Sequence, residues 1–183
     1  MTTNDHGDEL TPVDLEAFEL RWEALVDENI AGPHRQFVQG VFEPDGTKPS
    51  YCYTIGRTRL GLPELCIIGL NPNVGCYVLN MIAKREREDG LVLTENMILE
   101  ELVEGDFLMT VRTMADEKVI DLAERSVIRA ADEDPNAERG YAMWQVIYQD
   151  KDHRWPWEIP EPDIFHLIEP CLTNDGTWAN WRP

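Results

Sequence analysis

The segment that most constrains the fold runs from Glu64 to Pro72, where a nearly continuous apolar stretch, ELCIIGL, leads directly into Asn-Pro. An apolar run that does not alternate with polar residues is typical of a central strand covered on both faces of its sheet. Asparagine favours the N-cap of a helix and proline favours its first position, so a helix is expected over residues 72–89, ending at Gly90. Residues 64–89 are therefore interpreted as a strand–loop–helix unit whose first half is buried.

The remaining periodicity indicates a mixture of helices and strands. Amphipathic helices are expected over residues 11–32 and 113–131, where apolar side chains recur at helical spacing. Strands are expected over residues 35–42, 51–55, 106–114 and 141–148. These elements do not alternate in the regular way that would require a doubly wound parallel sheet. The expected fold class is α+β, a single domain with a mixed or antiparallel sheet of about five strands and about three helices.

Four segments are distinguished along the chain. A flexible arm is expected over residues 1–10 and an acidic amphipathic helix over residues 11–32. The α+β core domain is expected over residues 33–163, followed by a tryptophan-containing C-terminal tail over residues 164–183. One apolar stripe of the helix is expected to pack against the core, and its members are Leu15, Phe18, Trp22, Leu25 and Val26.

The charge of the chain is strongly negative, with 35 acidic and 16 basic residues among 183 and a formal net charge of −19. Residues 1–30 hold nine acidic residues and one arginine, and residues 95–106 hold five acidic residues and no basic one. Direct binding to nucleic acid or to an anionic membrane is not expected, because both require cations that face phosphates. The acidity is either a solvated, self-repelling surface, which is the more common case, or a face that fits a basic protein or mimics nucleic acid.

The location of the protein is expected to be cytoplasmic. No apolar run reaches the ~20 residues that span a bilayer, and the polar start MTTNDHGDEL lacks the basic and apolar regions of a secretory signal. The four cysteines form no CxxC pair and have no histidine at metal-ligand spacing, which favours reduced thiols that act as small hydrophobic side chains. Neither a metal site nor a cofactor is expected.

The first group of candidate site residues lies in the stretch YTIGRTRLGLPE, which joins an expected strand to the buried one. Its polar members are Tyr53, Thr54, Arg57 and Glu64. Glu64 either accepts hydrogen bonds from the neighbouring loop, which is the more common role of such a residue, or faces a cleft as an acid or base.

The second group lies in the stretch DKDHRWPWE and consists of Asp150, His153, Trp155 and Trp157. A histidine beside carboxylates can act as a general acid or base, although a histidine in a surface loop is the commoner case. Two indoles around a proline can stack on a planar ligand or anchor a partner, and the more common alternative is that they close over the core. No phosphate-binding loop, dinucleotide fingerprint, GxSxG or HExxH motif is present, so no catalytic residue is assigned.

Both stretches resemble the bacterial family called domain of unknown function 4262, whose members look like Y-T-I-G-L, then H-P-E-L and an apolar strand, and later P-D-x-x-G-x-F-P-W-E. The matching segments here are Tyr53–Arg57, Leu62–Leu65, Ile67–Leu70, Gln145–Asp150 and His153–Glu158. The chain departs from the pattern at Arg57, where Leu is usual, at Leu62, where His is common, and at His153, where Gly is common. The resemblance covers roughly residues 33–160 and implies a bacterial or phage origin, the extent of the domain and a grouping of the two motifs. It implies no chemistry.

Two functions are compatible with these observations. The absence of a catalytic motif, the acidity and the flanking acidic helix favour a non-enzymatic protein-interaction, regulatory or inhibitory module that binds a basic partner surface. The alternative is a small-molecule-binding enzyme, hydrolase-like, with a site between the YTIG/PEL and HRWPW elements. That alternative requires the two elements to meet around one concave pocket. Assembly into a homo-oligomer is compatible with either function.

Overall fold

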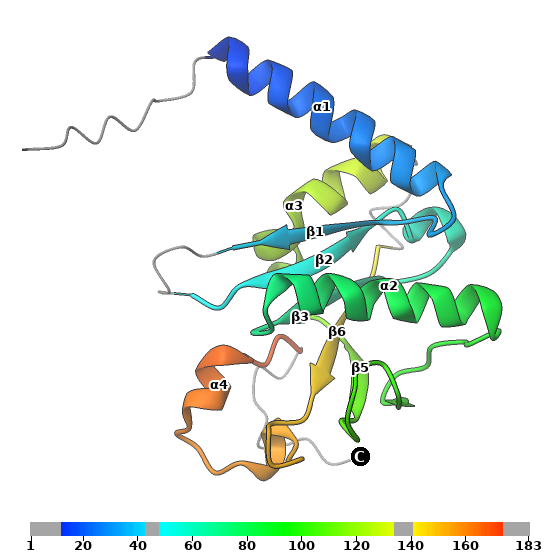
Figure 1. The fold of residues 1–183 in the computed structure, drawn as a ribbon. Helices are drawn as coiled ribbons and strands as arrows, with labels where there is room; N and C mark the ends of the chain where they lie inside the picture. Colours follow the sequence, from blue (N-terminus) through cyan, green and yellow to red (C-terminus); the bar gives the residue numbers. More distant parts are fainter. Residues whose placement is uncertain (1–11, 43–47, 134–140, 174–183) are drawn as a thin grey trace, which may run out of the picture.

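A six-stranded mixed sheet forms the centre of the computed structural model, which describes residues 12–42, 48–133 and 141–173 (Figure 1). The strands lie in the order β1-β2-β3-β6-β5-β4, and among them only the neighbours β3 and β6 run parallel. Their bounds are β1 Phe37–Val41, β2 Tyr51–Ile55, β3 Glu64–Ile68, β4 Ile98–Leu99, β5 Met109–Thr113 and β6 Met143–Tyr148. The expected α+β class with a mixed sheet is confirmed.

Helices cover both faces of this sheet. Helix α2 (Pro72–Glu88) packs on one face, and helices α1 (Pro12–Ala31) and α3 (Asp116–Glu133) pack on the other (Figure 1). Every residue of β3 is buried, because alternate side chains contribute to two different hydrophobic cores. Leu65 and Ile67 join the core beneath α2, whereas Cys66 and Ile68 join the core beneath α1 and α3. This two-sided burial explains the uninterrupted apolar run in the sequence.

The start of α2 follows the expected signals. The side chain of Asn71 accepts a hydrogen bond from the backbone N–H of Asn73 at 3.0 Å, and Pro72 occupies the first turn of the helix. The helix ends at Glu88, two residues before Gly90, which has a positive φ of 70°. Local capping thus sets both ends of the helix that covers one face of the sheet.

Two short elements are not expected from the sequence. Strand β4 extends the edge of the sheet beside β5, and helix α4 (Ile164–Ile168) lies within the C-terminal segment. Two-residue strands and single-turn helices carry too little periodicity to be recognised in a sequence. The expected arm over residues 1–10 lies outside the described residues, as do Trp178 and Trp181. Among the described helices, none has the length and apolar character needed to span a membrane.

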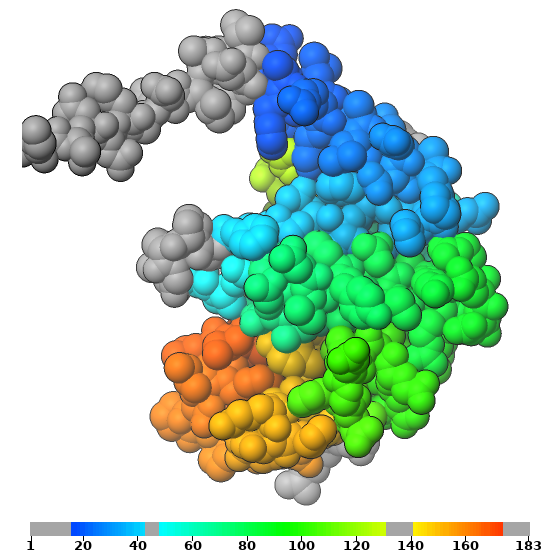
Figure 2. Space-filling model, in the orientation of Figure 1, coloured from blue at the N-terminus to red at the C-terminus, as the bar shows by residue number. Residues whose placement is uncertain are grey.

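Only the C-terminal half of α1 packs fully on the sheet. Val26 and Ile30 are buried, and Trp22 is half-buried with its ring edge against Phe37 at a centroid distance of 6.0 Å. Phe18 remains 54% exposed and Leu25 47% exposed, so the expected packing of the whole apolar stripe is wrong for these two residues. The side chain of Leu15 lies outside the described part. The space-filling view shows the N-terminal half of α1, in dark blue, projecting beyond the body (Figure 2).

Candidate functional site

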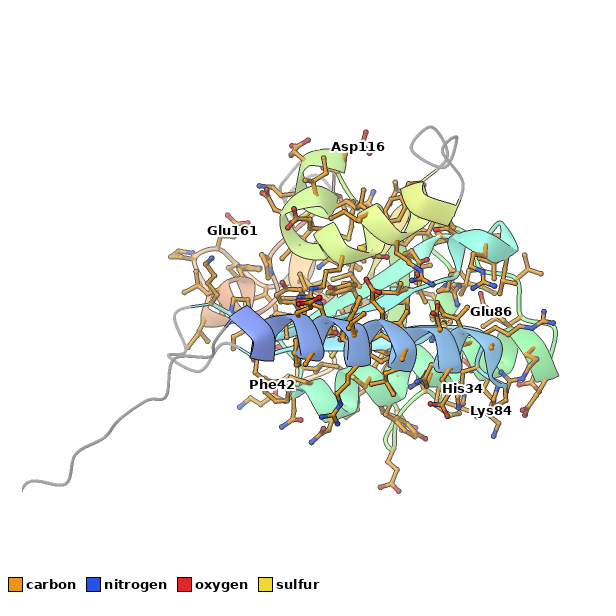
Figure 3. All side chains as sticks on the ribbon, turned by 90° about the horizontal axis from the view of Figure 1, so that it is seen from above. His34, Phe42, Lys84, Glu86, Asp116 and Glu161 are labelled. Atoms are coloured by element: carbon orange, nitrogen blue, oxygen red, sulfur yellow. The ribbon has the colours of Figure 1, made fainter. Side chains whose placement is uncertain are left out.

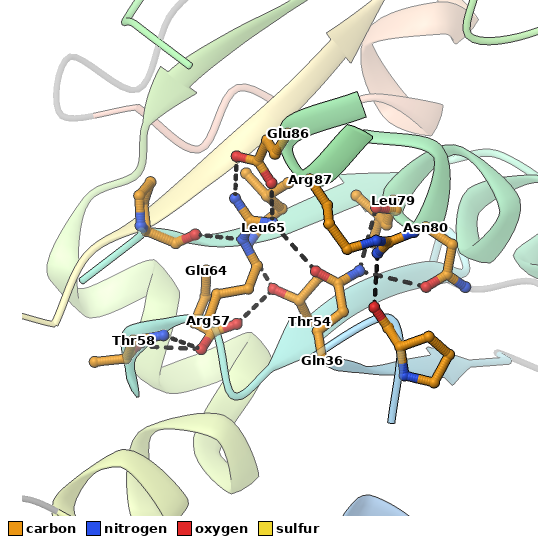
Figure 4. A network of polar contacts seen from close by, with 12 residues as sticks. Gln36, Thr54, Arg57, Thr58, Glu64, Leu65, Leu79, Asn80, Glu86 and Arg87 are labelled. Atoms are coloured by element: carbon orange, nitrogen blue, oxygen red, sulfur yellow. Dashed lines mark hydrogen bonds and ion pairs between the residues drawn. The ribbon is translucent and has the colours of Figure 1, made fainter. Parts of the chain in front are cut away.

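Glu64 lies at the first position of β3, and its buried carboxylate is fully engaged by the preceding turn (Figure 4). Oε1 accepts hydrogen bonds from the backbone N–H groups of Gly56 and Thr58, both at 3.0 Å, and from the Thr58 hydroxyl at 3.1 Å. Oε2 accepts a 2.5 Å hydrogen bond from the Thr54 hydroxyl, which itself accepts from the Leu65 N–H at 2.8 Å. Glu64 therefore fastens the β2–β3 turn, the first of the two roles considered from the sequence.

The turn also depends on Gly56. Its φ is +105°, a conformation that side chains with a Cβ rarely adopt. A Cβ at this position would lie 2.8 Å from two carbons of the Ile30 side chain. The glycine thus lets the end of α1 pack directly on the turn that Glu64 holds.

Arg57 forms a second buried polar cluster on the same turn (Figure 4). Its two terminal nitrogens donate to the two carboxylate oxygens of Glu86, on α2, at 2.7 and 2.8 Å. One of these nitrogens also donates to the Gln36 side-chain carbonyl at 3.2 Å, and Nε donates to the Pro63 carbonyl at 2.8 Å. Gln36 in turn donates to the Leu79 carbonyl at 3.2 Å. This bidentate pair joins the turn, the start of β1 and α2.

A cavity of about 310 Å³ opens beside the Arg57–Glu86 pair. Its charged and ionisable lining consists of His34, Arg35, Arg57, Arg87 and Glu86, and its apolar wall of Leu60, Leu62 and Ala83. The top view places His34 and Glu86 toward the same end of α1 and α2 (Figure 3). Arg87 is held at the rim by a 2.7 Å hydrogen bond that it donates to the Pro33 carbonyl. The lining carries three arginines against one glutamate, opposite in sign to the chain as a whole.

Asp150 follows β6 and organises a tight turn over residues 150–154. Its Oδ1 accepts from the backbone N–H groups of Asp152 and Arg154 at 2.9 and 2.8 Å, and its Oδ2 accepts from the Arg154 guanidinium at 2.9 and 2.6 Å. Burial raises the pKa of Asp150, but the hydrogen bonds from Arg154 and Asp152 outweigh it and hold the pKa below its ordinary value. This carboxylate is committed to the turn.

His153 and the two indoles surround this turn without forming an acid–base pair. His153 is exposed, has a positive φ of 59° and stacks on Phe107 at a centroid distance of 4.7 Å. Trp155 and Trp157 are half-buried and stack on each other at 4.9 Å with an interplanar angle of 10°. The Trp155 backbone N–H donates to the Glu158 carboxylate at 2.8 Å, which caps a short 3₁₀ turn.

The two groups of candidate residues lie at opposite ends of the central strand pair. Glu64 is in register with Met143 at the start of β6, whereas Asp150 follows the other end of that strand. At ~3.3 Å per residue, the five steps from Met143 to Tyr148 alone cover about 16 Å. The composite site required by the enzyme alternative therefore does not form. The structure brings Thr54, Arg57 and Glu64 together at one end.

Tyr53 belongs to neither group in space. It is buried in the core beneath α1 and α3, and its ring stacks on Tyr51 at a centroid distance of 6.2 Å. Burial raises the pKa of its hydroxyl to about 12, so it stays protonated at neutral pH. Its contribution is to packing.

An acidic helical layer, defined as residues 16–31 of α1 and 116–130 of α3, is not identified as one surface from the sequence. The α1 part carries five acidic residues and one basic residue, and the α3 part carries four acidic residues and three basic ones. Arg125 pairs with Glu19 at 2.7 Å and lies over the Trp22 ring at 4.6 Å, and Arg129 pairs with Asp27. On α1 the sequence signal is Leu20, an apolar residue outside the stripe expected to pack on the core. The layer exposes large apolar side chains at Phe18, Leu20, Leu25, Ile120 and Ile128.

The remaining groups to consider are side chains that could bind a metal ion and the four cysteine thiols. Within residues 12–42, 48–133 and 141–173, no group of three or more His, Cys, Asp or Glu side chains is placed to hold a metal ion. None of the four cysteines forms a disulfide; Cys52 and Cys66 are buried, and Cys76 and Cys171 are half-buried. The cavity beside Arg57 offers arginines that suit an anionic group.

Fold and site together define a small α+β domain with a mixed sheet between two helical layers, whose two polar motifs lie at opposite ends of its central strand pair. The chain belongs to the family described as domain of unknown function (DUF4262), whose profile matches residues 31–160. The family membership expected from the resemblance is confirmed. No curated protein and no solved structure matches the chain.

Proposed function

We propose that the protein is a non-enzymatic interaction module, regulatory or inhibitory, that binds a basic protein surface through the acidic helical layer. The observation that carries this proposal is the exposure of large apolar side chains on a helix that is rich in carboxylates. Phe18 and Leu25 are seven residues apart and therefore share one face of α1. Exposed apolar side chains rimmed by charge are characteristic of protein-binding surfaces.

The carboxylates of the layer supply charge complementarity to a basic partner. Glu19 and Asp27 are neutralised by arginines of α3, whereas Glu16, Glu23 and Glu28 are exposed and make no ion pair with any described residue. Apolar anchors provide most of the affinity of an interface, and surrounding charges steer the partner and select it. A basic surface with apolar pockets is the chemistry that fits this layer.

The polar motifs also support a non-catalytic role. The Glu64 and Asp150 carboxylates are each used by a neighbouring turn, and Arg57 is paired with Glu86. A general acid or base must reach a proton of the substrate, and these hydrogen bonds occupy the carboxylate oxygens that would do so. The chemically distinctive residues thus stabilise the fold that presents α1.

The test is a quantitative capture experiment from bacterial lysate with the immobilised full chain at low and raised salt. A partner of the proposed kind is basic, is retained by the wild type, and is lost when salt screens the charges. The variant F18A/L25A should weaken its binding by at least about tenfold, because two anchors are removed. The matched control V92A truncates an exposed valine outside the layer and should bind as the wild type does. Capture of no protein, or equal capture by F18A/L25A and V92A, would refute the proposal.

A second candidate function is the binding of a small organic anion in the cavity beside Arg57. The favouring observation is the excess of arginine in its lining, together with an apolar wall that fits a non-polar body. Arg35 makes no side-chain hydrogen bond or ion pair with any described residue, so its guanidinium can bind an added carboxylate or phosphate.

Phenyl phosphate, benzoate and inorganic phosphate are suitable probes for this cavity, with binding followed by NMR titration. Phenyl phosphate should bind most tightly, and Arg35→Gln should weaken it by about tenfold, the effect of one charge-assisted contact. Arg21→Gln removes the same charge from the exposed face of α1 and serves as the matched control. If no probe binds, or if both variants weaken binding equally, the cavity has no specific affinity for anions.

A further inference from the structure

Two thiols from different elements meet where α2 crosses β2. The Sγ atoms of Cys52, on β2, and Cys76, in the second turn of α2, are 3.6 Å apart and share a hydrogen bond. Gly75 allows this approach, because a Cβ at that position would lie 2.9 Å from the Cys52 sulfur. The helix and the sheet are thus in close contact at the thiol pair.

The two thiols differ in access and acidity. Cys52 is only 1% exposed and lies 3.3 Å from the Pro72 carbonyl, whereas Cys76 is half-buried at the edge of the contact. The hydrogen bond with Cys52 lowers the pKa of Cys76 to about 7, although burial acts in the opposite direction. The same hydrogen bond, followed by burial, raises the pKa of Cys52 well above its ordinary value. Cys76 is therefore both the more reachable and the more acidic of the two thiols.

We propose that Cys76 is an oxidation site for small peroxides and that Cys52 is its resolving thiol. The Cys76 thiolate attacks one oxygen of hydrogen peroxide, the O–O bond breaks, and a sulfenic acid and hydroxide form. The Cys52 sulfur then attacks the sulfenic sulfur, the S–OH bond breaks, and the Cys52 proton leaves with that hydroxide as water. In total, two thiols and one hydrogen peroxide molecule give one disulfide and two water molecules, because the hydroxide of the first step takes up the proton that Cys76 released on ionising.

The geometry favours an intramolecular product. The sulfurs lie 3.6 Å apart and must approach to the ~2.05 Å of a disulfide, a closure of about 1.5 Å. Cys66 points to the opposite core, and burial raises the pKa of its thiol to about 12. The bond between Cys52 and Cys76 would join α2 to the sheet covalently, and a dithiol reductant would reverse it by exchange.

The experiment uses the reduced full chain, treated with hydrogen peroxide, alkylated, digested and mapped by mass spectrometry without reduction. The expected product is a Cys52–Cys76 linkage, with Cys66 and Cys171 recovered as alkylated thiols. Cys52→Ser should accumulate a sulfenic acid at Cys76 that dimedone traps, and Cys76→Ser should form no intramolecular disulfide. Cys171→Ser is the matched control, because it removes the other half-buried thiol, and it should behave as the wild type does.

Three results would overturn the proposal. The first is a Cys76 that remains reduced under peroxide exposure that oxidises free cysteine. The second is oxidation of Cys171 or Cys66 before Cys76. The third is a product in which Cys76 links two chains rather than joining Cys52. Circular dichroism of each serine variant shows whether the fold is retained, and dimedone labelling of Cys52→Ser reads the first step independently of disulfide formation.

Discussion

Replacing Glu64 by glutamine tests whether this carboxylate is a structural fastening of the β2–β3 turn. The amide oxygen of the glutamine can keep the three hydrogen bonds that Oε1 now accepts from Gly56 and Thr58, but without the negative charge. The new amide nitrogen then faces the Thr54 hydroxyl, which can no longer donate to it. A bond to a charged acceptor contributes about 1 kcal/mol more than a neutral one, and an orphaned buried donor costs about 1 kcal/mol or more. The loss is therefore about 3 kcal/mol over the three retained bonds and about 1 kcal/mol at the Thr54 hydroxyl, so the unfolding free energy should fall by about 4 kcal/mol in total.

The assay is urea denaturation followed by tryptophan fluorescence, with the free energy of unfolding extrapolated to water. Glu64→Ala should cost more than Glu64→Gln, since it leaves the buried N–H groups of Gly56 and Thr58 without an acceptor. Glu88→Gln is the matched control, because its carboxylate is exposed and its change should stay within about 0.5 kcal/mol. If Glu64→Gln and Glu88→Gln lose the same unfolding free energy, the structural role of Glu64 is refuted, and Glu64 becomes a candidate catalytic residue again.

Three further predictions concern stability. Gly56→Ala should lower the free energy of unfolding, measured by urea denaturation, by about 2–4 kcal/mol, because Gly56 has a positive φ and its new Cβ would clash with Ile30. Gly61→Ala should cost only about 1 kcal/mol, because Gly61 also has a positive φ but a Cβ there would contact no other atom. The wild type should have a larger free energy of unfolding than Asp150→Asn. This difference should be complete above the unfolded-state pKa of ~3.9 and should decline as pH falls through the lowered pKa of the folded state. A difference that stays constant when unfolding is measured over the acid pH range would contradict this. Burial raises the pKa of Glu169 well above its ordinary value, so its ionisation destabilises the folded chain as pH rises, and Glu169→Gln should raise the thermal midpoint at pH 7 rather than lower it.

Local signals in the sequence are sufficient to predict the central elements. The run from Glu64 to Ile68 and the Asn71-Pro72 cap specify β3 and the start of α2 through burial and hydrogen bonds between near neighbours. The role of Glu64 is also open to prediction, because its partners lie within ten residues of it in the chain. Contacts between residues that are close in the chain can be predicted from a short segment of sequence, because that segment contains both partners.

Arrangements that depend on long-range pairing are not predictable in this way. The parallel pairing of β3 with β6 places the two motifs at opposite ends of the strand pair. The residues of either motif do not indicate whether the two strands run parallel or antiparallel. The helical periodicity of α1 shows an apolar face but not how far the sheet extends beneath it, which is why the prediction that Phe18 is covered is wrong. The meeting of Cys52 and Cys76 depends on how α2 crosses β2, and Gly75 is the residue whose missing side chain allows the crossing.

The parallel pairing of β3 and β6 has a consequence for how the domain tolerates change. The Glu64 motif fastens the turn that leads into β3, and the Asp150 motif organises the turn that follows β6, so the two motifs act at opposite ends of this strand pair. Sites separated by more than about 10 Å without a shared partner contribute independently to folding free energy. A chain carrying both Glu64→Gln and Asp150→Asn should therefore lose the arithmetic sum of the two single losses, and evolution can modify either terminus of the pair without compensating at the other.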